Sequence, residues 1–89
     1  MKCINEFTGY IIRKSGTVPN VGNRFFVEFR KGTSCREDFI IRDFEGFIGY
    51  PDENSCCKLY EYYTDGKNVT AEILSIKKEG TYCALFVVN

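Results

Sequence analysis

Apolar and polar residues alternate along two stretches of the N-terminal half, as expected for β-strands. Residues 2–14 predict one strand, and Gly9 within it suggests a bulge or a bend. Glycine, proline and asparagine then cluster in residues 15–23, which predicts a loop. Residues 24–31 form the second predicted strand, since successive side chains point to opposite faces. One face of that strand would carry Phe25, Val27 and Phe29.

The spacing of apolar residues changes in the middle of the chain. Ser34 and Glu37 have the spacing of a capping box, and the apolar positions that follow recur as on one face of a helix. The pattern therefore predicts a helix over residues 34–49, with an earlier end near Phe44 as a variant. Gly46 and the β-compatible run at 39–41 keep a strand over residues 38–44 open as an alternative.

Two dipeptides, Asp65-Gly66 and Glu79-Gly80, predict tight turns in the C-terminal third. A turn at the first would set Tyr60 opposite Ala71, and a turn at the second would set Ala71 opposite Val88. Tyrosines 60 and 62 would then point into the core from a strand that precedes the first turn. This gives a three-stranded meander after the predicted helix.

The opposite face of this predicted meander is also apolar, away from the first turn. A single helix covers only one side of a sheet, so this second face would need a cover of its own. Large exposed apolar patches usually mark interaction sites. The N-terminal strands could curl over this face, or a second subunit could cover it in a homodimer. The candidate subunit interface consists of Cys57, Leu74, Ile76, Cys83, Leu85 and Val87.

These elements predict one compact domain over residues 1–89. The expected fold class is α+β, with one helix packed on a curved antiparallel sheet of about five strands in the order ββαβββ. A small all-β barrel or roll is the alternative, and it applies if residues 38–44 form a strand.

The charge is zero overall but is unevenly distributed along the chain. Residues 1–36 carry seven Lys and Arg side chains against two acidic ones, and residues 37–65 carry two basic against eight acidic. Such asymmetry can create a basic and an acidic face, unless the two segments lie side by side and neutralise each other. The acidic candidates for partner binding are Glu37, Asp38, Asp43 and Glu45. The candidate nucleic-acid patch is Arg13, Lys14, Arg24, Arg30 and Lys31.

The residue content argues against several chemistries. Histidine is absent, which removes the usual general base and the commonest metal ligand. The five cysteines lack the paired spacing of a zinc site, so we expect no metal and no cofactor. Cys35 beside Arg36 is a candidate reactive thiol, but a half-buried structural role is favoured. We find no phosphate-binding glycine loop and no nucleophile elbow in the sequence.

The odd cysteine count favours free thiols in a reducing compartment, so we expect a cytoplasmic protein without a signal peptide or a membrane span. The sequence analysis leaves two classes of function. The first is a non-catalytic protein that binds a protein partner of unknown identity and is plausible as an inhibitor, for example a phage or mobile-element anti-defence protein. The second is a nucleic-acid or nucleotide-binding module that uses the basic N-terminal third. An enzyme is not expected.

Overall fold

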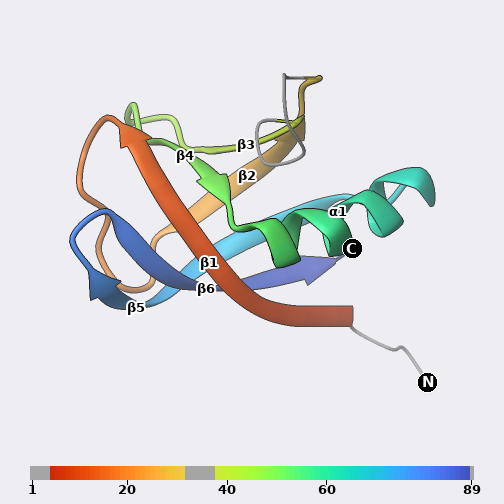
Figure 1. The fold of residues 1–89 in the computed structure, drawn as a ribbon. Helices are drawn as coiled ribbons and strands as arrows, with labels where there is room; N and C mark the ends of the chain where they lie inside the picture. The colour runs from red at the N-terminus through yellow and green to blue at the C-terminus, as the bar shows by residue number, and fades with distance from the viewer. Residues whose placement is uncertain (1–4, 32–37, 89) are drawn as a thin grey trace.

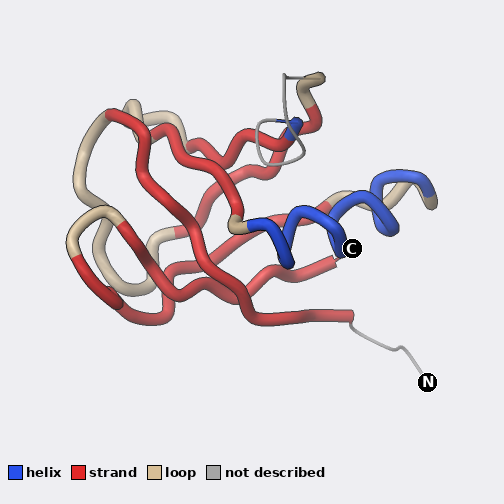
Figure 2. The backbone as a smooth tube through the Cα atoms, in the orientation of Figure 1, coloured by secondary structure: helices blue, strands red, loops and turns tan. Residues whose placement is uncertain are grey.

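The computed structural model describes residues 5–31 and 38–88. This part of the chain forms six antiparallel strands that close into a barrel, in the order β1-β4-β3-β2-β5-β6 (Figure 1). A helix joins β4 to β5, as the backbone tube in Figure 2 shows. The elements are β1 (Asn5–Ser15), β2 (Arg24–Phe29), β3 (Phe39–Arg42), β4 (Ile48–Pro51), α1 (Glu53–Thr64), β5 (Val69–Lys78) and β6 (Thr81–Val88).

The architecture corresponds to the alternative fold class, the small all-β barrel. The α+β expectation holds only in that one helix accompanies an antiparallel sheet, and the order is ββββαββ rather than ββαβββ. Within the described residues, no helix has the length and apolar character needed to cross a membrane.

The predicted helix over residues 34–49 is wrong, because its described part consists of β3, a turn and the start of β4. Backbone pairing on both sides of β3 outweighs the helical spacing of its apolar residues. The connecting turn is stabilised by Asp43, whose Oδ1 accepts hydrogen bonds from the backbone N–H groups of Glu45 (2.9 Å) and Phe47 (3.0 Å). Gly46 has a positive φ of 105° there, which L-residues rarely adopt. The expected Ser34–Glu37 cap and Cys35 lie outside the described residues.

The helix α1 lies where the sequence pattern predicted a strand and a hairpin. Gly66 does not form a hairpin turn but ends α1 with a φ of 73°. Its N–H donates to the carbonyl of Tyr63 (3.0 Å), and the N–H of Lys67 donates to the carbonyl of Tyr62 (3.0 Å). This pair of bonds is the Schellman motif, which satisfies carbonyls at the end of a helix. The predicted pairing of Tyr60 with Ala71 is therefore wrong.

The start of α1 is attached to β1. The backbone N–H of Asp52 donates to the carbonyl of Tyr10 (2.9 Å), and the N–H of Tyr10 donates to Oδ1 of Asp52 (3.0 Å). The hydroxyl of Ser55, which is buried, donates to the same Oδ1 (2.5 Å). Gly9 lets the helix approach this closely, because a Cβ at that position would overlap Oγ of Ser55. Pairing of β1 with β6 is regular through Gly9, so the predicted bulge is not there.

The β5–β6 hairpin turns at Glu79-Gly80 with Lys78 opposite Thr81, as predicted, but irregularities at Ile76/Lys78 and Ile73/Ser75 shift the register by two residues from Ile73 back to Val69. Ala71 pairs with Phe86, whereas the sequence analysis placed it opposite Val88. A shift of two residues leaves each side chain on the same face. The inward face of β6 is therefore the expected one, and its buried residues are Tyr82, Ala84, Phe86 and Val88.

The core fills the barrel and extends under α1. Phe25 and Phe47 pack with ring centroids 4.6 Å apart inside the barrel. Cys56 and Leu59 of α1 belong to the same buried cluster, as do residues at the ends of β5 and β6. Tyr62 stacks on Phe7 with centroids 6.0 Å apart. The helix thus covers one end of the barrel, and this location positions the candidate site.

Candidate functional site

The barrel is split between β2 and β5 on the side of α1. Pairing of these strands runs only as far as Phe26 and Thr70. The same register would set Val27 opposite Val69, but the described strand pairs stop before this point. On its other edge β2 remains paired with β3 along residues 26–29. Residues 27–29 of β2 therefore have an edge with no strand partner among the described residues.

The strands separate here because residues 65–68 connect the end of α1 to the start of β5 and do not pair with β2. The Schellman turn at Gly66 directs the backbone away from the helix, and β5 begins only at Val69. Side chains of α1, and not another strand, therefore cover the gap beside the unpaired edge of β2.

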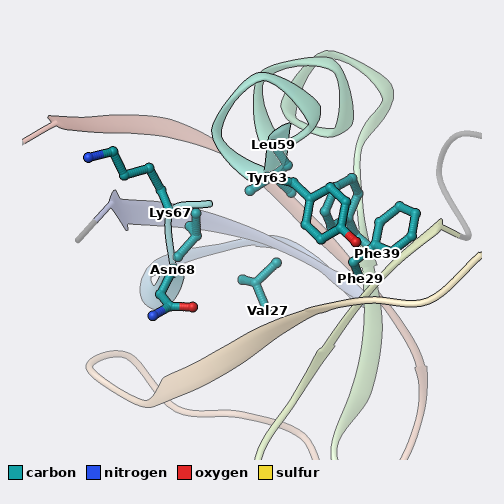
Figure 3. Close-up of a pocket in the computed structure, with 8 residues that line it drawn as sticks. Val27, Phe29, Phe39, Leu59, Tyr63, Lys67 and Asn68 are labelled. Atoms are coloured by element: carbon teal, nitrogen blue, oxygen red, sulfur yellow. The ribbon is translucent and has the colours of Figure 1, made fainter. Parts of the chain in front are cut away.

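A pocket of about 140 Å³ occupies this gap. We call it the aromatic pocket. Figure 3 shows the rings of Phe29, Phe39 and Tyr63 on one side, Lys67 and Asn68 on the other, and Leu59 of α1 above. The residues that line it are Val27, Phe29, Phe39, Leu59, Tyr63, Lys67, Asn68 and Val69.

The aromatic wall is a packed group of rings. Phe29 and Tyr63 stack with centroids 4.2 Å apart and planes inclined by 17°. Phe39 meets Phe29 edge to face at 5.4 Å and Tyr60 at 5.0 Å. Phe29 and Tyr63 nevertheless remain 37% and 48% exposed. Contacts between rings hold the wall in place, while its outer surface stays open to a ligand.

The polar residues of the lining are Lys67, Asn68 and, through its hydroxyl, Tyr63, and Figure 3 shows the ammonium group of Lys67 at the outer side, directed away from the rings. Few polar groups around an apolar surface are typical of a binding site. Among residues 5–31 and 38–88, no group of three or more His, Cys, Asp or Glu side chains is arranged to hold a metal ion. The lining residues offer mainly apolar contact.

The acidic candidates do not form one cluster on a helix. Asp43 and Glu45 lie in the turn between β3 and β4, and Asp38 directly precedes β3. Glu37 lies outside the described residues. The turn carries an unexpected feature, because the side chain of Phe44 is 92% exposed and contacts Phe26, with ring centroids 5.1 Å apart. We call residues 43–47 the Phe44 turn.

The basic candidates are dispersed and partly engaged. Arg13 donates from Nη1 to the carbonyl of Gly16 (2.8 Å), and Lys14 donates to the hydroxyl of Tyr50 (3.0 Å). Arg24 forms an ion pair with Glu72 (3.3 Å). Arg30 and Lys31 are exposed after β2. Arg24 and Arg30 are separated by a strand length of roughly 20 Å. The arrangement does not make one continuous basic stripe.

The fold brings only some of the residues of the candidate subunit interface onto one face. Leu74 and Ile76 of β5 are exposed, and β6 contributes half-buried residues to its outer surface. Cys57 lies on α1 and not on a strand. The β5–β6 outer face therefore consists of Leu74, Cys83, Leu85 and Val87, with Ile76 at its end.

Sequence reasoning did not identify the aromatic pocket. Its tyrosines were assigned to a strand, so their role on a helix was missed. The signal was present, because Cys56, Leu59 and Tyr63 recur at spacings of three and four, as on one face of a helix. Phe29 was expected on the apolar side of β2, but nothing in the sequence indicated that the strand beside it would end.

No family model matches this chain, and neither a curated protein nor a solved structure is similar enough to be counted as a match. The aromatic pocket and the Phe44 turn are therefore interpreted from their geometry and chemistry.

Proposed function

We propose that this protein is a non-catalytic binding domain that captures an extended segment of a partner protein in the split between β2 and β5. The observation that carries the proposal is the aromatic pocket beside the strand edge at residues 27–29. An extended peptide can add to such an edge through main-chain hydrogen bonds, while a neighbouring pocket selects its side chain.

The size of the pocket indicates which side chain it takes. An apolar cavity of about 150 Å³ accommodates a benzene molecule, and the pocket has about 140 Å³. It therefore accepts one phenyl ring or one branched aliphatic side chain. The partner segment would place a phenylalanine or leucine there, with an acidic residue near the ammonium group of Lys67.

An inhibitory role is compatible with this mode of binding, because occupying an extended segment of a partner denies that segment to other molecules. The odd number of cysteines, five, supports the proposal of a reducing, cytoplasmic environment. Nucleic-acid binding is the less supported alternative, since Arg24 is already paired with a carboxylate.

The proposal is tested by NMR titration of the ¹⁵N-labelled protein with a short blocked peptide of alternating polar residues and a central phenylalanine. We expect shifts in the amide signals of residues 27–29 and 67–69. Replacing the central phenylalanine by alanine should weaken binding at least about tenfold, as expected for loss of a buried aromatic side chain.

Two protein variants locate the effect. Tyr63→Ala removes part of the pocket wall and should weaken binding of the phenylalanine peptide. Tyr10→Ala is the matched control, because Tyr10 is a partly exposed tyrosine on β1 and does not line the pocket. Equal binding of both peptides, or equal effects of both variants, would overturn the proposal. A mobility shift of single-stranded DNA that disappears on charge reversal of Arg24, Arg30 and Lys31 would favour the nucleic-acid alternative instead.

A further inference from the structure

The Phe44 turn has the properties of a preformed binding element. Its phenylalanine is almost fully exposed, whereas its backbone is held by two hydrogen bonds to Asp43. The edge of Phe26 supports the ring from one side. A side chain presented by an ordered turn loses little conformational freedom when it binds.

The aromatic pocket of the same protein is complementary to this turn. The pocket has room for one phenyl ring, and the turn projects one. The charges also match, because Asp43 and Glu45 flank Phe44 and the charged side chain at the pocket is Lys67. Opposite charges beside the ring and beside the pocket favour the approach of the two surfaces.

The turn cannot fill the pocket of its own chain. Phe39 lines the pocket at the start of β3, and the turn begins after Arg42 at the other end of the strand. A strand rises roughly 3.3 Å per residue, so the turn begins roughly 10 Å beyond Phe39 and continues away from it. The ring and the pocket are thus available to two different molecules.

We infer that the aromatic pocket binds the Phe44 turn of a second copy of this chain. The contact is heterologous, because the two surfaces that meet are different. An open assembly then keeps one free turn at one end and one free pocket at the other, so association continues beyond a dimer or closes into a ring. This inference rests on the proposed function only in that both use the same pocket, and self-association would compete with capture of the partner.

Sedimentation velocity from micromolar to millimolar concentration tests the inference. The wild-type protein should show an average mass that rises with concentration past that of a dimer. Phe44→Ala should weaken association at least about tenfold, because the ring is the buried group. Val21→Ala is the matched control, since Val21 is another exposed apolar loop residue, and this variant should associate like the wild type.

A mixing experiment separates the two surfaces. Phe44→Ala retains only the pocket, whereas Val27→Phe fills the pocket and retains only the turn. Lys67→Glu serves as a second pocket variant, because Lys67 is exposed and its replacement leaves the core intact. Each variant alone should be monomeric, and an equimolar mixture of Phe44→Ala with either pocket variant should form a one-to-one dimer that grows no further.

Three results would overturn the inference: a monomeric wild type at millimolar concentration, association that is unchanged in Phe44→Ala, or mixtures that do not form the dimer. A dimer that is insensitive to Phe44→Ala but is lost in Leu74→Glu would assign association to the β5–β6 outer face. Peptide binding by a wild-type protein that stays monomeric would refute self-association while leaving the proposed function in place.

Discussion

Replacement of Gly9 by alanine tests the contact that joins α1 to the barrel. A Cβ at this position would overlap Oγ of Ser55 and would lie 3.1 Å from Cβ of Ser55 and 3.2 Å from Oδ1 of Asp52. The hydroxyl of Ser55 would have to leave its hydrogen bond to Asp52, because β1 is held in register on the other side by β6. We expect Gly9→Ala to fold but to be strongly destabilised.

The magnitude follows from three effects. Loss of a buried hydrogen bond to a carboxylate costs about 1.5–3 kcal/mol, and the remaining tight contacts add about 1–3 kcal/mol of overpacking. Alanine restricts the unfolded chain, which offsets about 0.4–1 kcal/mol. The free energy of unfolding should therefore fall by about 1.5–5.5 kcal/mol, a large part of the total stability of a domain of this size.

Urea unfolding followed by circular dichroism measures this change, and a double-mutant cycle with Ser55→Ala identifies its cause. Ser55→Ala removes the overlapping atom, so Gly9→Ala should cost at least about 1 kcal/mol less in the Ser55→Ala background than in the wild type. Additive effects, or a Gly9→Ala protein within about 0.5 kcal/mol of the wild type, would refute the proposed close approach of helix and strand.

Three further substitutions test other parts of the fold. Gly66→Ala places an L-residue at a φ of 73° with open space around it, so only backbone strain of about 1–2 kcal/mol should appear, measured as a fall of at least about 4 °C in Tm; an unchanged Tm would contradict the assigned helix end. Leu59→Ala should lower the free energy of unfolding by about 2–5 kcal/mol in guanidinium titrations, because the side chain is fully buried beneath α1; a loss below about 1 kcal/mol would argue against that packing. The Arg24–Glu72 pair, whose arginine side chain is 82% exposed, should show a coupling energy below about 1 kcal/mol in a double-alanine cycle at low salt, and a coupling twice as large would disagree with the exposed geometry.

Some residues of the candidate sites could be predicted from the sequence, and others could not. The acidic residues and the dispersed arginines could be proposed as candidates because the sequence itself shows which residues are charged. The aromatic pocket was not, since it is made by residues from β2, β3, α1 and the start of β5 that meet only in the folded chain. Its location also depends on pairing between β2 and β5 ending at Phe26, and the sequence contains no local signal for that end.

The sequence by itself determined the local elements whose signals agree. Residues 24–29 form a strand, the loop before them contains the expected glycine and asparagine, and Glu79-Gly80 turns a hairpin whose buried face is the predicted one. These features depend on neighbouring residues and on the alternation of side chains, which any strand must obey.

Only the tertiary structure decided between helix and strand in the middle of the chain. Residues 39–42 form a strand because β2 pairs with all four and β4 pairs with residues 41–42 on the other side. Residues 53–64 form a helix whose apolar side chains are buried against the end of the barrel. Asp65-Gly66 suits either a hairpin or a helix end, since both require a residue with positive φ. Long-range pairing and burial made that choice, and the same choice created the split that holds the aromatic pocket.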